Sequence, residues 1–156
     1  MAEMVPVGSA APDFILPKDG GGTISLGEFR GRKLVVYFYP KANTSGCTKE
    51  AIAFNRLKPA FDEAETLILG ISADRVAALE KFKRKYALDF PLASDETFKM
   101  LQAYGVWSEK SLYGRTFLGI TRATYLIDRE GLIAKRWPKV KIEGHAEEVL
   151  AAATAL

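Results

Sequence analysis

The 156-residue sequence contains a single cysteine, Cys47, and a single histidine, His145. One cysteine cannot form a disulfide within the chain, so we expect a protein of a reducing compartment, with the cytoplasm as the default. Disulfide exchange of the Cys-x-x-Cys type is excluded, because the residue three positions before Cys47 is Thr44. A structural zinc site usually has about four ligands, more than one cysteine and one histidine supply, and we predict no metal and no other cofactor.

Long apolar runs and a large excess of charge are absent as well. No window approaches the roughly 18 apolar residues of a transmembrane helix, and residues 1–14 lack the pattern of a secretory signal. Lysine and arginine number 22 against 19 aspartate and glutamate, and the net charge of +3 is too small to indicate nucleic-acid binding. The densest basic run, residues 81–85, is interpreted as a solvated helix face. We therefore expect one soluble domain, residues 1–156, with no nucleic-acid or membrane partner.

Two segments have the composition of strands that are buried on both faces of a sheet. Residues 33–39 and 65–71 are rich in β-branched, aromatic and aliphatic residues without polar alternation, as in a parallel sheet. A helical pattern follows each strand, beginning at Cys47 in the first case and covering 76–86 in the second. These strand–helix units indicate an α/β protein.

Shorter elements surround this central part. They are an N-terminal hairpin over 14–16 and 23–26, strands over 90–93, 123–127 and 132–137, and helices over 98–104 and 145–156. This order predicts a central mixed β-sheet flanked by helices on both faces, of thioredoxin-like shape, with an N-terminal β-hairpin.

Cys47 is expected at the start of a helix that follows a buried strand. Sites in open α/β sheets form beyond the carboxyl ends of the strands, and a helix N-terminus supplies free N–H groups and a positive dipole end. Both features favour a reactive thiolate. A lone cysteine is often just a small buried apolar residue, but residues 41–46 are polar and turn-forming. His145 could pair with Cys47 in a hydrolase, although it could equally cap the last helix.

The segment Pro40-Lys-Ala-Asn-Thr44-Ser-Gly-Cys47 contains the pattern Pro-x-x-x-Thr-x-x-Cys and resembles the peroxiredoxins. Several further stretches resemble the peroxiredoxin Q class, also called bacterioferritin-comigratory proteins. These stretches are 8–14, 36–40, 47–51, 105–107, 113–119 and 120–128. The resemblance covers nearly the whole chain, and the combination is far more specific than a lone Thr-x-x-Cys.

The resemblance implies that Cys47 attacks a peroxide and becomes a sulfenic acid. Thr44 would offer its hydroxyl to the peroxide oxygens, Pro40 would shield the thiolate from water, and Arg122 would lie beside the thiolate. Fixed donors aimed at the negative charge of the breaking bond lower the barrier, and an arginine carries several donors in a rigid fork. Thr44 as a plain helix cap and Arg122 as a surface residue are the alternatives.

The chain departs from many members of this class, which carry a second, resolving cysteine. In some members the resolving cysteine lies five residues after the first cysteine, and this chain has Ile52 at that position. In others it lies on the following helix, in the region of Lys83 and Arg84, where this chain has no cysteine either. Ile52 falls on the predicted apolar stripe of the helix, so we expect it to be packed. The chain therefore resembles a one-cysteine peroxiredoxin.

Recycling of Cys47 then requires an external thiol, with thioredoxin, glutaredoxin and glutathione as candidates. A monomer is expected, as is common in this class. Two alternatives to a peroxidase stay open at this point. One is a redox sensor or partner-binding module that uses Cys47 without turnover, and the other is a thioredoxin-fold protein with an inert cysteine.

Overall fold

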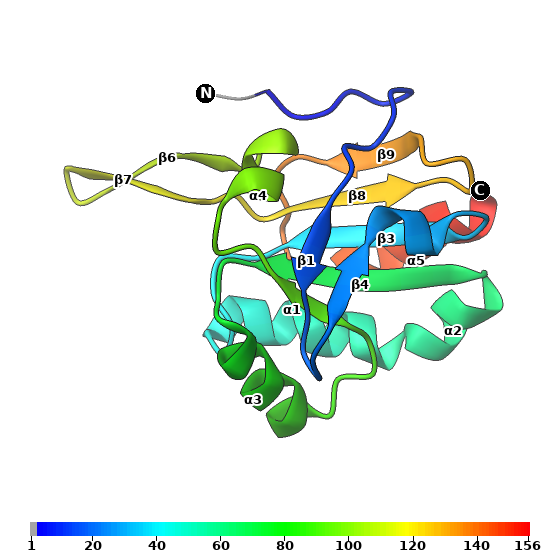
Figure 1. Ribbon diagram of the computed structural model, residues 1–156, viewed down its shortest axis with the longest axis horizontal. Coiled ribbons are helices and arrows are strands. Elements are labelled where there is room, and N and C mark those ends of the chain that lie inside the picture. Colours follow the sequence, from blue (N-terminus) through cyan, green and yellow to red (C-terminus); the bar gives the residue numbers. More distant parts are fainter. Residues whose placement is uncertain (1–2) are drawn as a thin grey trace.

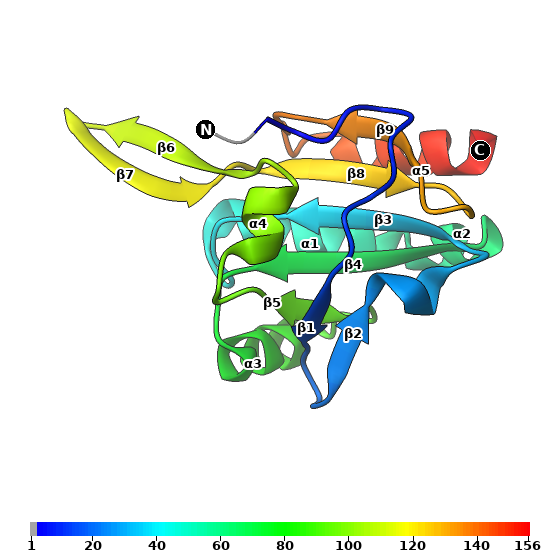
Figure 2. The same cartoon turned by 45° about the horizontal axis from the view of Figure 1, so that its top comes forward.

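The computed structural model describes residues 3–156, so the first two residues of the predicted domain lie outside the described residues. A five-stranded sheet is formed by β3 (Lys33–Phe38), β4 (Thr66–Ser72), β5 (Leu92–Ser94), β8 (Ala123–Ile127) and β9 (Ile133–Trp137). Their order is β5-β4-β3-β8-β9 (Figures 1 and 2). Strands β3, β4 and β5 are parallel, whereas β8 is antiparallel to both β3 and β9. The predicted α/β class and mixed sheet are confirmed.

Helices cover one face of the sheet, and the N-terminal part of the chain covers the other. The helical layer contains α1 (Ser45–Arg56), α2 (Lys58–Glu63), α3 (Val76–Tyr86) and α5 (His145–Ala155). The opposite layer contains the hairpin β1 (Ile15–Pro17) and β2 (Thr23–Ser25), the 3-10 helix η1 (Leu26–Phe29) and α4 (Lys99–Ala103) (Figure 2). A hydrophobic core lies on each side of the sheet.

Strand β3 lies at the centre of the sheet, and all six of its residues are buried. Its apolar side chains alternate between the core under the N-terminal hairpin and the core under the helices. Both faces are therefore covered, which explains why the sequence shows no polar alternation here. In the antiparallel pairing with β8, Phe38 lies opposite Ala123. This register brings the end of β3 beside Arg122, the residue that precedes β8.

The helix after β3 differs from the prediction in two respects. Ile52 is 45% exposed rather than packed, and the buried side chains of α1 are Cys47, Glu50, Ala51 and Phe54. The helical segment is also divided into α1 and α2. Pro59 lies in the first turn of α2, where a missing N–H is tolerated, but it would clash inside a continuous helix.

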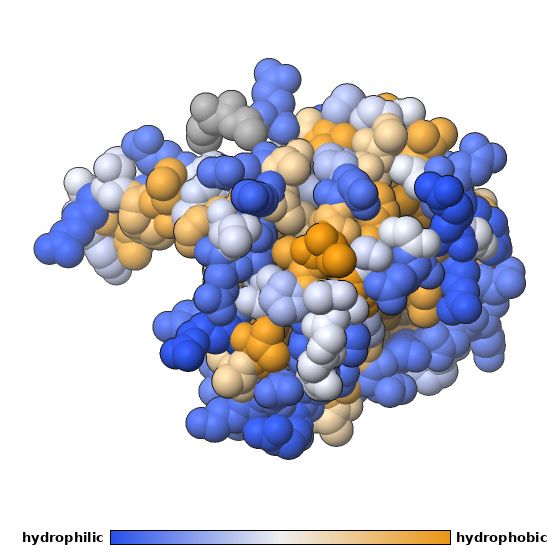
Figure 3. Space-filling view, in the orientation of Figure 1, coloured by the Kyte–Doolittle hydropathy of each residue, from blue (hydrophilic) through white to orange (hydrophobic). Residues whose placement is uncertain are grey.

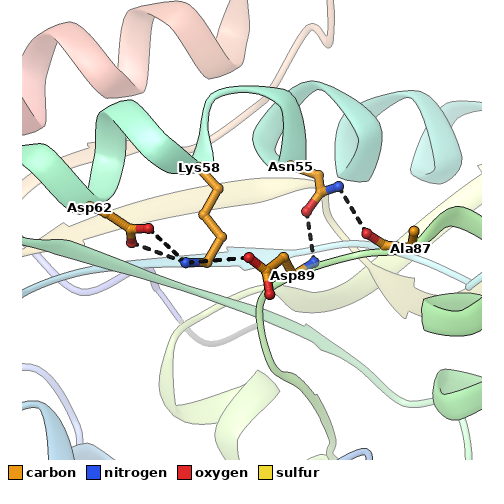
Figure 4. Close-up of polar contacts among 5 residues, drawn as sticks. All are labelled: Asn55, Lys58, Asp62, Ala87 and Asp89. Atoms are coloured by element: carbon orange, nitrogen blue, oxygen red, sulfur yellow. Dashed lines mark hydrogen bonds and ion pairs between the residues drawn. The ribbon is translucent and has the colours of Figure 1, made fainter.

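Side chains at this break tie it to the loop between α3 and β5 (Figure 4). The Asn55 amide donates to the carbonyl of Ala87 at 3.1 Å and accepts from the backbone N–H of Asp89 at 2.7 Å. The Lys58 ammonium lies 2.9 Å from an oxygen of Asp62 and 3.9 Å from one of Asp89. These contacts join α1, α2 and α3 at the end of α1 that is remote from Cys47.

The N-terminal hairpin is present as predicted, and its turn carries a buried aspartate. One oxygen of Asp19 accepts from the Lys83 ammonium at 2.7 Å, and the other accepts from the backbone N–H of Leu92 at 2.8 Å. Lys83 was expected on a solvated helix face, but its side chain is only 31% exposed because it reaches this carboxylate. The pair connects the hairpin turn to α3 and β5.

Residues 107–120, for which the sequence predicts no element, form a two-stranded arm that projects from the body (Figures 1 and 2). Its strands are β6 (Trp107–Leu112) and β7 (Arg115–Ile120). The turn residues Tyr113 and Gly114 both have positive φ, of 52° and 76°, as a two-residue type I′ hairpin requires. Most of the arm is exposed on both faces, so the alternation that reveals a half-buried strand is missing.

Candidate active site at the start of helix α1

Cys47 is the third residue of α1 and lies just beyond the end of the central strand β3. The first hydrogen bond of the helix runs from the N–H of Thr48 to the carbonyl of Thr44, at 2.9 Å. The N–H groups of the first helical residues therefore have no acceptor within the helix, and the positive end of the helix dipole lies at the thiol. The thiol is buried, with Cys47 only 1% exposed.

The loop before α1 is held in place by residues of the neighbouring elements. The carboxylate of Asp74, which follows β4, accepts from the backbone N–H of Ala42 and from the Ser72 hydroxyl, both at 2.7 Å. Asn43 adopts a left-handed backbone with φ of 62°, which asparagine tolerates better than most residues. Its side-chain oxygen accepts from the Tyr86 hydroxyl at 3.2 Å. These contacts fix the entry of the chain into α1.

Arg122 precedes β8 and reaches the thiol from that side of β3, whereas Asp74 lies on the β4 side. Its Nη2 donates to the Sγ of Cys47 at 3.3 Å, although the two residues are 75 positions apart in the sequence. The carbonyl of Arg122 accepts from the N–H of Val140 at 3.0 Å, which fixes the backbone that carries the guanidinium. The structure thus brings together the cysteine and the arginine that the sequence singles out, through the register of β3 and β8.

Glu50 joins this pair, and the sequence interpretation missed it. Its Oε1 accepts from the Nη1 of Arg122 at 2.7 Å, and its side chain is 2% exposed. The second oxygen, Oε2, is buried and has no hydrogen-bond partner. Burial raises the pKa of Glu50 from 4.5 to about 7, an effect that outweighs the opposing charge of Arg122. The available signal was the spacing, because an acid three residues after Cys47 lies on the same helix face.

One guanidinium therefore serves two acceptors, the sulfur of Cys47 and the carboxylate of Glu50. Gly46 makes room for this arrangement. A Cβ atom at Gly46 would lie 3.2 Å from the Nη2 of Arg122 and 3.2 Å from the Cδ1 of Ile142. Such distances are tighter than ordinary contacts, so the absence of a side chain at Gly46 lets the guanidinium approach the start of α1.

Thr44 and Pro40 lie in the loop next to the thiol. The Thr44 hydroxyl donates to the carbonyl of Lys41 at 2.7 Å, so its proton is used within the loop and not by Cys47. Thr44 makes no side-chain cap of the helix either. Pro40 follows the buried Tyr39 and is itself exposed. Both residues are thus close in the chain to the start of α1, and neither side chain forms a hydrogen bond with the sulfur in this structure.

His145 does not pair with the thiol. Its Nε2 lies 2.9 Å from the hydroxyl of Thr124, and its ring packs edge-on against Phe54 and Trp137. Burial lowers the pKa of His145 to about 4, which makes the ring neutral at physiological pH. The side chain is part of the core beneath α5, and the hydrolase interpretation has no catalytic pair in this geometry.

Within residues 3–156 no three His, Cys, Asp or Glu side chains are grouped so that they could hold a metal ion. Nor does that part of the chain contain a helix of sufficient length and apolar character to cross a membrane. What the site offers is a buried sulfur, a guanidinium in contact with it and free backbone donors at a helix start. This combination can stabilise negative charge on sulfur and on an oxygen that approaches it.

The model of the AhpC/TSA family matches residues 7–136. A putative peroxiredoxin Bcp of Coxiella burnetii is 46% identical over 146 residues, which cover 94% of this chain and 97% of the relative. A solved structure of a PrxQ cysteine-to-serine mutant from Xylella fastidiosa has a TM-score of 0.93 at 35% identity, and the match covers 99% of this chain and 98% of that one.

A structure of the bacterioferritin comigratory protein of Xanthomonas campestris has a TM-score of 0.89 at 42% identity and covers 99% of this chain and 98% of that one. That protein has alkyl peroxide reduction activity. These likenesses confirm the thioredoxin-like form of the predicted fold. The chain therefore belongs to the AhpC/TSA family, in which it is a one-cysteine relative of the Bcp and peroxiredoxin Q proteins.

Proposed function

We propose that this protein is a thiol-dependent peroxidase that reduces hydrogen peroxide and organic hydroperoxides at Cys47. The observation that carries the proposal is the 3.3 Å contact between Arg122 and the buried sulfur at the start of α1. The peroxiredoxin relatives and the alkyl peroxide reduction named for the Xanthomonas protein support the same activity.

The first step is attack of the Cys47 thiolate on one oxygen of the peroxide. A sulfur–oxygen bond forms, the oxygen–oxygen bond breaks, and its electron pair leaves on the second oxygen. That oxygen takes up a proton and departs as water or an alcohol. Sulfur loses two electrons and becomes a sulfenic acid, while the peroxide gains two. Arg122 is placed to stabilise the charge that is shared between the two oxygens.

The roles of the neighbouring residues belong to the same proposal. Thr44 would offer its hydroxyl oxygen to the peroxide hydrogen, since its own proton is already donated to Lys41. Pro40 would limit water near the thiolate, because it has no N–H group to bind water. Glu50 would hold Arg122 in place from the buried side.

The second step returns the sulfur to its starting state. An external thiol attacks the sulfenic sulfur and releases water, which leaves a mixed disulfide with Cys47. A second thiol then attacks the sulfur of the first external thiol in this disulfide. The two external thiols become joined in a disulfide, and Cys47 leaves as the free thiol. The chain has no other cysteine, so both thiols come from outside. We propose thioredoxin, glutaredoxin or glutathione as their source.

We propose further that residues 1–156 act as one domain, as a monomer and in the cytoplasm. The requirement for an external thiol supports a reducing compartment.

Removal of the sulfur tests the proposed activity. Purified protein with dithiothreitol should consume hydrogen peroxide, and Cys47→Ser should abolish this turnover, because a serine hydroxyl is not ionised at neutral pH. Ile52→Ser, an exposed position on the same helix, is the matched control and should stay active. Full activity of Cys47→Ser would disprove the proposal. Rapid sulfenic acid formation without turnover by any thiol would instead identify a redox sensor.

A further inference from the structure

The β6–β7 arm combines exposed apolar side chains with a well-held base. Leu112, Tyr113, Phe117 and Leu118 are between 47% and 95% exposed, and apolar side chains are visible along the projecting arm (Figure 3). They make up four of the eight large hydrophobic residues that are exposed in residues 3–156. Such a concentration on a projecting element marks an interaction surface.

The base of the arm is fixed to the body of the protein. Trp107 stacks on Phe98 with ring centroids 4.3 Å apart. The hydroxyls of Ser108 and Thr121 are 3.0 Å apart, and the N–H of Thr121 donates to the carbonyl of Val106 at 2.7 Å. The arm is therefore presented in a defined direction, and β7 leads directly into Arg122.

The two faces of the arm differ in charge. In its register Lys110 lies opposite Phe117, Leu112 opposite Arg115 and Ser108 opposite Gly119, and these six residues share one face. We call this the Lys110 face. It carries two cations, two large apolar side chains and no acid. Glu109 and Leu118 lie opposite each other on the other face.

The Lys110 face is the one directed toward the active site. The side chain of Lys110 runs across Gly119, where a Cβ atom would meet its Cδ at 3.3 Å. Gly119 lies three residues before Arg122, so this path leads toward the guanidinium. The pKa of Lys110 is lowered, first by burial and then by the positive charge of Arg122, which agrees with the proximity of the two groups.

We propose that the Lys110 face of the arm docks the protein that reduces the oxidised Cys47, a thiol protein with apolar and acidic surface beside its reactive cysteine. This inference rests on the proposed function, in which the reducing thiols come from outside the chain. The arm offers two features to such a partner. Phe117 and Leu112 give it apolar contact area, while Lys110 and Arg115 select negative charge.

The occupant is a protein of this kind rather than a small thiol or a second copy of the chain. A small thiol cannot cover side chains that are distributed along a six-residue hairpin strand. A symmetric pairing of two arms through this face would bring the Lys110 and Arg115 cations of both copies into one interface, with no acid on the face to compensate. Within residues 3–156, β6 and β7 also pair only with each other, so a partner can bind their open edges.

Adjacent residues on opposite faces provide a matched test. Peroxidase turnover is measured with a bacterial thioredoxin or glutaredoxin as the reductant, and separately with dithiothreitol. Phe117→Ser should lower kcat/KM for the protein reductant about tenfold, because it removes an apolar contact at the interface. Leu118→Ser, on the other face, should change it less than about twofold. Neither variant should change turnover with dithiothreitol or the rate of oxidation by hydrogen peroxide.

A change of charge gives a second, independent test. Arg115→Glu should lower kcat/KM for the protein reductant and weaken its dependence on salt, whereas Arg30→Glu at an exposed position outside the arm should have little effect. Equal losses in Phe117→Ser and Leu118→Ser, or no loss in either, would overturn the proposal. A wild-type dimer that becomes monomeric in Phe117→Ser, measured by sedimentation, would assign the face to a second copy and overturn it too.

The outcomes separate this inference from the proposed function. Turnover with dithiothreitol but with neither protein reductant would reject the docking face and leave the peroxidase standing. Absence of turnover with every reductant, dithiothreitol included, would reject the peroxidase itself. Circular dichroism of each variant verifies that the loss is not one of folding.

Discussion

Two buried carboxylates in this protein are paired with a cation, and their surroundings differ. Asp19 in the N-terminal hairpin is 8% exposed, and both of its oxygens have partners, the Lys83 ammonium and the N–H of Leu92. Glu50 beside the active site is 2% exposed, and only one of its oxygens has a partner, the guanidinium of Arg122. The cation of Asp19 serves that carboxylate, whereas Arg122 also donates to Cys47.

Under the proposed function, the difference distinguishes an ion pair that only stabilises the fold from one that takes part in the reaction. A fully paired carboxylate stabilises the connection between elements and leaves nothing free for a ligand. A carboxylate with an unpaired oxygen costs free energy, and such a cost persists where the arrangement has a chemical use. We therefore expect changes at Asp19 and Lys83 to alter stability, and changes at Arg122 and Glu50 to alter reactivity and its dependence on pH.

The largest expected effect compares Arg122 with Lys83 by the rate of Cys47 oxidation. Arg122→Met should lower the rate constant of Cys47 oxidation by hydrogen peroxide by about 10²–10³-fold, because one fixed donor to the developing charge is lost. Lys83→Met should leave the rate constant within about twofold of wild type. Stopped-flow oxidation of the reduced proteins measures both values, and thermal unfolding confirms that they are folded. Comparable losses in the two variants would remove the distinction.

The pH dependence of stability separates Glu50 from His145, another buried titratable group of the core. Burial raises the pKa of Glu50 from 4.5 to about 7, so the folded state retains a proton that the unfolded state releases, and stability falls with rising pH. Burial lowers the pKa of His145 from 6.5 to about 4, so stability rises with pH in that interval. Each of these two pKa shifts corresponds to a change of about 3 kcal/mol in the free energy of unfolding.

These two contributions nearly cancel between about pH 4.5 and 6.5, and single variants should reveal each of them. The free energy of unfolding should rise by up to about 3 kcal/mol over this interval in Glu50→Gln and should fall by a similar amount in His145→Asn. Urea unfolding at half-unit steps of pH measures both slopes. Identical slopes in wild type and the two variants would show that neither group titrates as inferred.

The structural pair should act on stability alone. Asp19→Ala should lower the free energy of unfolding by about 2 kcal/mol, because the buried N–H of Leu92 loses its acceptor and Lys83 loses its partner. Peroxidase turnover should not change. Asp62→Ala, which breaks the exposed pair with Lys58, is the control and should cost less than about 0.5 kcal/mol. An equal cost in the two variants would contradict the role given to Asp19.

The smallest expected effect concerns the space beside Arg122. Gly46→Ala should lower the rate of Cys47 oxidation about threefold, because the new Cβ would displace the guanidinium by a few tenths of an ångström. Gly27→Ala is the control, since a Cβ there meets no atom within 4 Å. A rate in Gly46→Ala equal to that of wild type would show that the guanidinium tolerates the shift.

The sequence predicted the sheet well because its central strands are buried on both faces. The unbroken apolar runs of β3 and β4 cannot belong to an exposed element, and α3 showed helical spacing at its observed bounds. The arm was missed for the opposite reason, since most of its residues are exposed and no burial pattern marks them. The break between α1 and α2 was visible in Pro59, a signal that the apolar stripe obscured.

The site could be predicted in part. The position of Cys47 followed from local pattern, since a strand and a helix adjoin it in the sequence. Arg122 came only from the resemblance, because it lies 75 residues away and only the pairing of β3 with β8 brings it close. Glu50 was missed because a glutamate in a helix usually faces solvent. Asp74 was missed because one of its two donors, the N–H of Ala42, lies in another loop.

The register that places Phe38 opposite Ala123 also has a consequence for biosynthesis. The chain is made from its N-terminus, so a nascent polypeptide presents Cys47 long before Arg122 has left the ribosome. Until β8 inserts beside β3, the sulfur lacks the cation that would speed its oxidation. We therefore expect the thiol of an unfinished chain to react more slowly with peroxide and to acquire its full reactivity when the sheet is complete.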